Sequence, residues 1–403
     1  MRVYFKNLDG IRFIAALLVI LQHTSDYKEF QNKGISNIFR PYVGDFGSYG
    51  VTLFFVLSGY LIFYLLFAEK QVTNTISIKN FYIRRILRIW PLYIGFGLVL
   101  IFGIDYVLAK VGTPVHTPAL TNLFYLCTFS INLQMLFAIP NKGIIELYWS
   151  VCIEEQFYLF APWLVKKGYK KMLSVIIGLI VIGIASKFVL HYIELHYDVY
   201  TVLSEYTLKL NFPFKNFHIS DHFNHNNPLY FFTLCRLDNF GFGALAAWIY
   251  FNKPLYAKVE KIVTNKIVQI IVVLFTFLYI THIIPEGRFI NLYFFSTVPS
   301  ILFAYIIMSA STGDFFINLE NKPLKLLGKY SYGIYVFHAV VSELILVAFM
   351  KFLPANTLLN YDVLYPLTCI VCTAIVAALS YELYERHFMK LKQRFTIVKN
   401  HDT

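Results

Sequence analysis

Long apolar runs separated by short polar segments extend from the first residues of the chain to about residue 384. An α-helix needs about 20 predominantly apolar residues to cross the hydrocarbon core of a bilayer. Runs of about that length cover residues 8–25, 46–67, 89–108, 145–165, 172–193, 228–250, 267–285, 290–310, 330–352 and 362–384. The pattern therefore predicts an all-α integral membrane protein with about ten transmembrane helices.

One further apolar stretch, residues 119–138, is broken by polar side chains. These are Asn122, Ser130, Asn132 and Gln134. Because each would have to be satisfied at bilayer depth, we expect a re-entrant or surface-lying segment here. An eleventh span is the alternative.

Lysine and arginine are distributed unequally between the two sides of the predicted membrane domain. If the N-terminus is cytoplasmic, 24 of the 35 basic residues fall in cytoplasmic segments and 9 in outer segments, while Lys187 and Arg236 lie inside spans. This asymmetry is what the positive-inside rule requires, and it predicts that both termini face the cytoplasm. The net charge of +12 is then explained by loops that contact anionic lipid, so no nucleic-acid partner is expected.

The composition agrees with a membrane protein. Hydrophobic residues make up 58% of the chain and charged residues only 14%, against about 45–50% and 25% in soluble domains. We therefore divide the chain into one membrane-embedded domain, residues 1–385, and a short basic cytoplasmic tail, residues 386–403.

Several ionisable residues lie at bilayer depth, where each costs about 2.5–3.5 kcal/mol on insertion scales and is usually functional or paired. A passive scaffold would not need them, so they predict a polar cavity inside the bundle. The residues are Arg12, His23, Glu154, Glu155, Arg236, Asp238, His338 and Glu343.

The first helix carries two of these residues in a defined register. Arg12 and His23 are eleven positions apart, which at about 100° per residue is only about 20° past three full turns. They therefore share one helix face and lie roughly 16 Å apart along the axis. Arg12 is expected near the cytoplasmic surface and His23 beyond the midplane, as suits a substrate that enters from the cytoplasm and reacts inside the membrane.

The other charged candidates need partners. Glu154 and Glu155 point about 100° apart, so at most one can face His23. Arg236 and Asp238 are two residues apart and cannot pair with each other on a helix. We expect partners across the bundle, for example Arg236 with one of the two glutamates.

Ser58 and an arginine cluster complete the polar candidates. Ser58 could be a nucleophile, but no G-x-S-x-G elbow surrounds it, which favours a lining role. Arg84, Arg85 and Arg88 lie at the cytoplasmic end of a helix, where Arg84 and Arg88 share a face and could bind phosphate. Topology signalling alone is the alternative.

The outer segment near 194–227 contains His218, His222 and His225. Their spacing could hold a metal ion. Because aspartate and asparagines surround them without a firm helix, we expect a solvated loop facing the acceptor and no metal site.

Six motifs occur in an order typical of one family. The sequence resembles acyltransferase family three, integral-membrane O-acyltransferases that modify extracytoplasmic sugars and some small molecules. The motifs are LDGIRFIAALLVILQH, FFVLSGYLI, RRILRIWPLY, WSVCIEEQFYL, RLDNFGFGALAA and GKYSYGIYVFH. The resemblance covers the whole chain.

This resemblance implies a ten-helix acyltransferase domain in a bacterial cytoplasmic membrane and a cytoplasmic acyl-CoA donor. It makes Arg12 and His23 the defining functional pair. It also implies roles for a further set of residues: Ser58, Arg85, Arg88, Glu154, Glu155 and Arg236.

Two features depart from the family pattern. The usual E-R-P-F is E-R-H-F here, from Glu385 to Phe388, so the proline-fixed end of the last helix is in doubt. Many relatives carry a secreted hydrolase-like domain after the bundle, whereas this sequence ends without one. Any second acyl-transfer partner would then be a separate periplasmic or extracellular protein.

The expected reaction is transfer of an acyl group, most simply acetyl, from acetyl-CoA to a hydroxyl of a cell-surface or lipid-linked sugar. Arg12, Arg85 and Arg88 would hold the nucleotide phosphates. No tightly bound cofactor is expected.

His23 would act as general base, oriented by Glu154 or Glu155, or would itself carry the acyl group. Ser58, Tyr332 or a backbone amide would stabilise the oxyanion. Arg236, Asp238, Tyr332 and His338 are expected to line the substrate path.

A membrane transporter or flippase of a polysaccharide precursor is the alternative function, because charges at the midplane also mark transport paths. That function predicts two related halves with broken helices at matching positions. The sequence has no such internal symmetry.

Overall fold

The computed structural model describes residues 2–31, 35–104, 119–137, 144–196, 227–284, 287–354, 358–396 and 399–400. The longer α-helices are α1 (Leu8–Gln31), α3 (Phe46–Thr73), α4 (Ile78–Val99), α8 (Trp149–Gly168), α9 (Met172–His196), α12 (Leu237–Phe251), α13 (Lys253–Val263), α14 (Lys266–Ile280), α16 (Thr297–Ser311), α18 (Ser331–Phe352) and α19 (Tyr365–Ser380). The shorter ones are α2 (Arg40–Val43), α6 (Ala119–Cys127), α7 (Ile131–Phe137), α11 (Asn227–Phe231), α15 (Arg288–Phe294), α17 (Lys322–Lys329) and α20 (Arg386–Lys392).

Several helices are extended by 3₁₀ or π turns. These are η1 (Leu100–Ile104), η2 (Ile144–Tyr148), η3 (Tyr169–Lys171), η4 (Thr233–Arg236), η5 (Leu359–Leu364), η6 (Tyr381–Glu385) and η7 (Gln393–Phe395). The strands in the described residues are β1 (Arg2–Val3) and β2 (Lys399–Asn400), which pair in parallel. The secondary structure of the described residues therefore confirms the predicted all-α class.

Six helical stretches of the described residues are long and apolar enough to cross a membrane, or up to seven if α13 and α14, bent by 76°, form one span. One of the six, Ile145–Ile193, contains both α8 and α9. The chain is thus a multi-pass membrane protein. The number ten stays a prediction.

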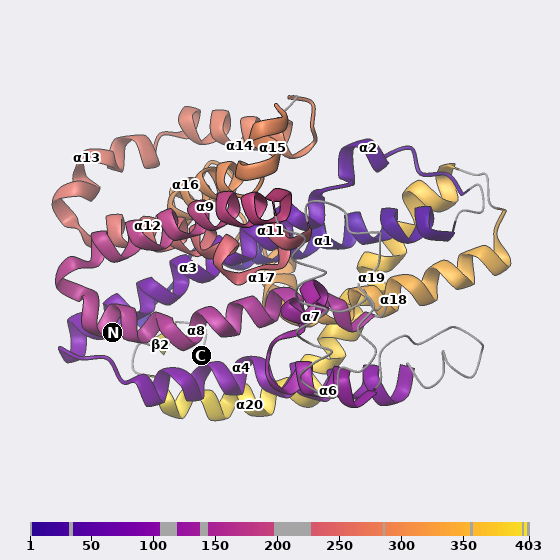
Figure 1. Ribbon diagram of the computed structural model, residues 1–403, viewed down its shortest axis with the longest axis horizontal. Helices are drawn as coiled ribbons and strands as arrows, with labels where there is room; N and C mark the ends of the chain where they lie inside the picture. Colours follow the sequence, from indigo (N-terminus) through magenta and orange to yellow (C-terminus); the bar gives the residue numbers. More distant parts are fainter. Residues whose placement is uncertain are drawn as a thin grey trace.

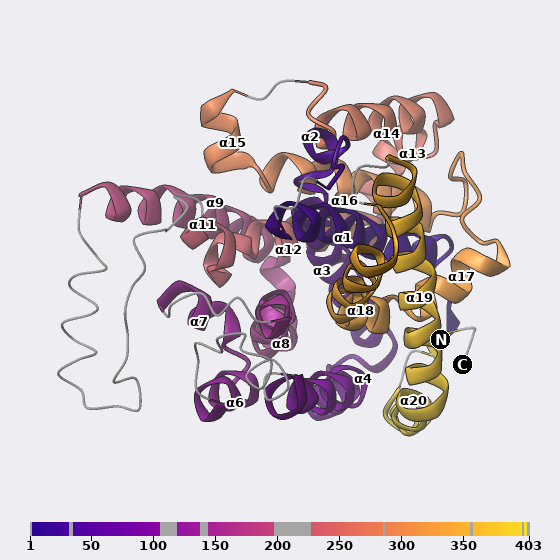
Figure 2. The same ribbon diagram turned by 90° about the vertical axis from the view of Figure 1, so that its right-hand side faces the viewer.

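The helices run mainly along the long axis of the molecule (Figure 1), so that α4 and α8 are seen nearly end-on after a quarter turn (Figure 2). The connections from α3 to α4, from α8 to α9 and from α12 to α13 lie at the end of the bundle that also holds both termini. These are connections that the distribution of lysine and arginine assigns to one side of the membrane.

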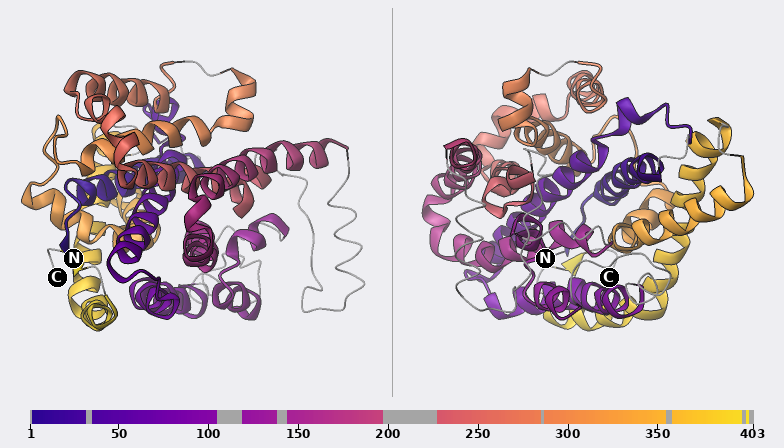
Figure 3. Two further views of the ribbon diagram at one scale, coloured as in Figure 1. Left: turned by 90° about the vertical axis from the view of Figure 1, so that its left-hand side faces the viewer. Right: turned by 45° about the vertical axis from the view of Figure 1, so that its right-hand side comes forward.

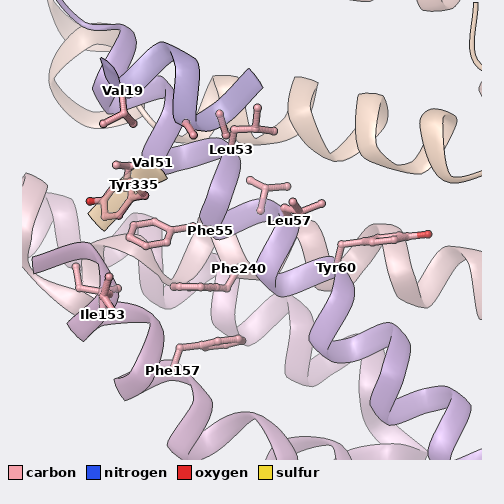
Figure 4. Packing of buried hydrophobic residues seen from close by; sticks show 14 of the residues in the cluster. Val19, Val51, Leu53, Phe55, Leu57, Tyr60, Ile153, Phe157, Phe240 and Tyr335 are labelled. Atoms are coloured by element: carbon pink, nitrogen blue, oxygen red, sulfur yellow. The ribbon is translucent and has the colours of Figure 1, made fainter. Parts of the chain in front are cut away.

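The crossing of α3 and α12 forms the centre of the bundle (Figure 3). A Cβ atom on Gly59 would lie 2.2 Å from the carbonyl oxygen of Phe240, and one on Gly243 would lie 2.0 Å from that of Val56. Only glycine permits backbones to approach this closely. Beside the crossing, the rings of Phe157 and Phe240 stack with centroids 4.1 Å apart (Figure 4).

Some helices begin or end beyond the apolar runs that predicted them. The helix expected over 89–108 begins at Ile78, where the hydroxyl of Ser77 accepts a hydrogen bond from the backbone N–H of Asn80. A cap of this kind sets a helix end regardless of hydrophobicity. Arg84, Arg85 and Arg88 therefore lie in the second and third turns of α4.

The segment predicted to be re-entrant or surface-lying forms two short helices, α6 and α7. Its polar residues form hydrogen bonds within the protein: the Gln134 amide donates to Asn122 Oδ1 at 2.8 Å, and the Gln156 amide donates to Asn132 Oδ1 at 2.9 Å. Asn122 Nδ2 and Gln134 Oε1 are buried without a partner in the described residues. Neither α6 nor α7 is as long as a span requires.

Candidate active site

A cavity of about 270 Å³ opens between α1, α3, α4, α8, α18 and the end of α20 with η7. Its wall combines basic residues, aliphatic and aromatic residues of α3, and a polar cluster from α3 and α8. Five cations line it: Arg12, Arg84, Arg85, Arg88 and Lys392.

The five cations are not equally neutralised. Arg12 pairs with Asp9 one turn earlier on α1, and Arg84 Nη2 lies 3.0 Å from Glu69 Oε2. No carboxylate of the described residues forms a salt bridge with Arg85, Arg88 or Lys392. The cavity thus contains uncompensated positive charge, which favours an anionic ligand.

The positive charge of Arg85 is stabilised by aromatic side chains. Its guanidinium lies over the rings of Tyr158 and Phe81, with Cζ 5.5 Å and 5.8 Å from the ring centroids. Its Nε is buried and has no hydrogen-bond partner in the described part of the chain. The aromatic faces stabilise the cation and leave hydrogen-bond capacity for a ligand.

The polar cluster inside the cavity consists of Ser58, Glu154 and Tyr158. The Ser58 hydroxyl donates to Glu154 Oε1 at 2.9 Å, and the Tyr158 hydroxyl donates to Glu154 Oε2 at 2.8 Å. Tyr158 lies four residues after Glu154 on α8, so both point to one face. Because the carboxylate accepts from both hydroxyls, it fixes the position of the Ser58 oxygen in the cavity.

Glu155 points elsewhere. Its Oε2 accepts a hydrogen bond of 2.9 Å from the indole N–H of Trp90, and it does not line the cavity. The expected divergence of the two glutamates is therefore observed. Neither is brought to His23, since each carboxylate is bound to other groups.

Two tyrosines of α18 line the cavity. The Tyr332 hydroxyl donates to the Ile89 carbonyl oxygen at 3.0 Å, so its proton joins α18 to α4. The Tyr335 hydroxyl lies 2.6 Å from Ser150 Oγ and donates to the Leu147 carbonyl oxygen at 3.0 Å. As placed here, Tyr332 is a wall residue whose hydroxyl is already engaged.

His23 does not line the cavity; it lies beside α18, against His338. Its Nδ1 donates to the Val19 carbonyl oxygen at 2.8 Å, which leaves the lone pair of the neutral ring on Nε2. The His338 ring packs against it with centroids 4.9 Å apart. His338 Nδ1 donates to the carbonyl oxygen of Tyr335, so the histidine pair adjoins a residue of the cavity wall.

Arg236 does not form the ion pair expected with a glutamate. It is fully buried, its Nε donates to the Tyr230 carbonyl oxygen at 2.9 Å, and its guanidinium lies 4.3 Å from the Tyr230 ring centroid and 4.8 Å from that of Phe295. Aromatic faces thus replace the expected carboxylate. Arg236 does not line the cavity.

Asp238 is also absent from the cavity wall. Its Oδ2 lies 2.7 Å from Lys187 Nζ, and both residues are fully buried. Lys187 also donates to Ser296 and Thr297 at 3.0 Å and 2.8 Å. Asp238 is therefore one half of an ion pair that joins α9 to α12.

The structure thus brings together Arg12, Ser58, Arg85, Arg88 and Glu154 in one cavity. Tyr158 and Lys392 are additions that the sequence did not single out, although the i,i+4 spacing from Glu154 could have found Tyr158. His218, His222 and His225 lie outside the described residues. Chemically, the cavity can bind a ligand with an anionic end and an apolar arm that reaches a polar centre.

An acyltransferase domain family matches residues 5–381. Three relatives illustrate the similarity. A Staphylococcus aureus (strain COL) protein named "Putative O-acetyltransferase" is 29% identical over 367 residues, or 84% of this chain and 51% of the relative. The O-acetyltransferase OatA of Staphylococcus aureus (strain NCTC 8325 / PS 47) is 26% identical over 358 residues, 83% of this chain and 50% of the relative.

The third relative is the peptidoglycan O-acetyltransferase OatA of Listeria monocytogenes serovar 1/2a (strain ATCC BAA-679 / EGD-e). It is 29% identical over 192 residues, 44% of this chain and 28% of the relative. The chain spans about half the length of the staphylococcal relatives it matches. No solved structure matches the chain.

Proposed function

Because the chain belongs to the acyltransferase domain family, we propose that it is a membrane O-acetyltransferase. The donor is cytoplasmic acetyl-CoA, and the acceptor is a hydroxyl of a cell-surface or lipid-linked sugar. The relatives named as O-acetyltransferases support the reaction class, and the peptidoglycan named for the Listeria protein supports a glycan acceptor. The observation that carries the proposal is the cavity that joins an arginine cluster to a buried polar centre.

The donor enters at the basic part of the cavity. Coenzyme A carries several phosphate charges that cannot enter hydrocarbon, and Arg85 and Arg88 offer guanidinium groups that form no salt bridge in the described residues. Arginine binds phosphate with charge-assisted, often bidentate, hydrogen bonds. Arg12 joins them from α1.

The pantetheine arm follows the apolar wall of α3. Leu57, Leu61 and Leu65 of this helix line the cavity. The thioester then lies near the cluster of Ser58, Glu154 and Tyr158. A Ser58 or Tyr158 hydroxyl that exchanges its hydrogen bond to Glu154 for one to the carbonyl oxygen can stabilise the negative charge that develops there.

His23 acts on the acceptor. Since Nδ1 donates to Val19, Nε2 of the neutral ring accepts a proton from the sugar hydroxyl, and that oxygen attacks the thioester carbon. The carbon–sulfur bond breaks, and CoA leaves as the thiol after it takes up one proton. In the alternative order, Nε2 first takes the acetyl group and then passes it to the sugar.

The same proposal includes the topology. Ten spans, with both termini in the cytoplasm of a bacterial cytoplasmic membrane, put the arginine cluster at the cytoplasmic mouth. His23, about 16 Å further along α1, then lies toward the outer face, where the glycan is. A separate extracytoplasmic acyltransferase can receive the acyl group if the bundle does not deliver it to the final acceptor.

The test replaces His23 by alanine. We expect acetyl incorporation into surface glycan, measured by mass spectrometry, to fall about 100-fold or more, because general-base catalysis contributes on this order. His196→Ala is a matched control, since His196 also donates from Nδ1 to the carbonyl four residues earlier but lies exposed at the end of α9. Normal acetylation by a His23→Ala protein present at wild-type level in the membrane would overturn the mechanism.

A further inference from the structure

The residues after the last long helix form part of the cavity wall. Lys392, Gln393 and Thr396 line the cavity together with residues of α1, α3 and α4. The sequence alone assigns them to a basic tail. In the structure α20 packs along α4, and Arg84 Nη1 donates to the carbonyl oxygen of Phe395 at 2.9 Å.

The end of the chain is anchored a second time. The strand Lys399–Asn400 pairs in parallel with Arg2–Val3, so these two pairs of residues are held side by side. Both termini accordingly lie close together at one end of the bundle (Figure 2). Of the described residues near the end of the chain, α20 is therefore held by α4 and β2 by β1.

Lys392 has unusual surroundings for a lysine. Its ammonium interacts electrostatically with four arginines, Arg88, Arg85, Arg12 and Arg84. No carboxylate of the described residues forms a salt bridge with it. Five cations at one partly buried site repel one another strongly unless an anion lies between them.

The neighbouring basic residues of α20 lack these surroundings. Lys390 is exposed and does not line the cavity, while Arg386 is exposed and pairs with Glu382 at 2.9 Å. The positive-inside rule alone accounts for exposed basic residues such as Lys390 and Arg386. Lys392 alone among the lysines and arginines of α20 adjoins the arginine cluster.

We infer that Lys392 is a donor-binding residue and that Lys392, Gln393 and Thr396 complete the phosphate site of the acyl-CoA donor. This inference rests on the proposed function. The site recognises a ligand with more than one phosphate group, because Arg85, Arg88 and Lys392, which form no salt bridge in the described residues, carry more positive charge than the roughly −1.5 to −2 of one phosphate monoester balances. Coenzyme A has this chemistry.

The test measures CoA binding to the full-length protein in detergent by calorimetry. Lys392→Gln should weaken binding about tenfold, which corresponds to about 1.4 kcal/mol, the order expected for one charge-assisted contact. Lys390→Gln on the same helix should bind CoA within about twofold of wild type, and Lys392→Arg should retain most of the affinity because it keeps the charge.

Arg88→Gln separates this inference from the proposed function. If Arg88→Gln weakens CoA binding and Lys392→Gln does not, the donor site stands and the role of Lys392 is overturned. If neither change affects binding, the donor site itself is wrong. If Lys392→Gln does not fold, Lys392→Arg decides: CoA affinity lost in a folded Lys392→Arg protein overturns the inference, and affinity retained there but lost at high salt supports it.

Discussion

Glu154 is the residue whose surroundings most directly suggest chemistry, since it accepts hydrogen bonds from Ser58 and Tyr158 within the cavity. A glutamine at this position keeps the shape but presents one acceptor oxygen in place of two. We expect Glu154→Gln to lower turnover about tenfold or more, in line with the loss of hydrogen bonds to a charged group. The Michaelis constant for acetyl-CoA should change little, because the phosphates bind elsewhere.

The adjacent glutamate provides the comparison. Glu155 accepts from the Trp90 indole outside the cavity wall, and a glutamine oxygen can accept the same bond. Glu155→Gln should therefore retain most of the turnover, as measured in the same radiolabelled acetyl-transfer assay. Equal losses in the two variants would show that Glu154 acts only through the stability of α8.

Side-chain partners were the part of the site that sequence spacing predicted least well. The register of Arg12 with His23 and the divergence of Glu154 from Glu155 follow from helix geometry alone. The partners of Arg236 and Asp238 do not, because they depend on which helices lie beside α12. The buried Lys187 on α9 provides the partner of Asp238, and nothing within either helix indicates that pairing.

Among the helices, the crossing of α3 and α12 gives the clearest prediction. Gly59→Ala should force the two backbones apart, since its Cβ would lie 2.2 Å from a carbonyl oxygen. Overpacking of this kind costs about 1–3 kcal/mol or more. We expect a lower melting temperature for the protein in detergent, measured by the change in its intrinsic tryptophan fluorescence on heating.

Gly178 on α9 is the control for that experiment, because a Cβ added there would meet nothing within 4 Å. Gly178→Ala should leave the melting temperature unchanged or raise it, as alanine favours a helix over glycine by up to about 1 kcal/mol. A Gly59→Ala protein as stable as Gly178→Ala would mean that the crossing can relax without loss.

The existence of the long helices could be predicted from hydrophobic periodicity, whereas their ends could not. α4 begins eleven residues before the predicted start because Ser77 caps it. At the other end of the chain, the helix continues through Glu385 into α20, with histidine at position 387 where the family pattern has proline. Histidine retains the N–H and steric freedom that proline lacks, so the sequence does not force a break there.

For the whole molecule, the proposed orientation can be tested with a membrane-impermeant maleimide on intact cells. In a Cys127→Ser background, a cysteine at Tyr42, exposed on α2, should react from outside. A cysteine at Lys390 should react only after the membrane is permeabilised, because positive-inside asymmetry puts α20 in the cytoplasm. Labelling of position 390 in intact cells would reverse the topology and with it the side from which the donor enters.

The wall of the donor cavity includes residues from nearly the whole length of the chain, from Arg12 on α1 to Lys392 on α20. During synthesis, α1 therefore leaves the ribosome long before α20 does. A partly made chain has its first helix in the membrane but no closed donor site. Under the proposed function, a nascent chain that lacks α20 cannot hold acetyl-CoA firmly until translation of the bundle has finished.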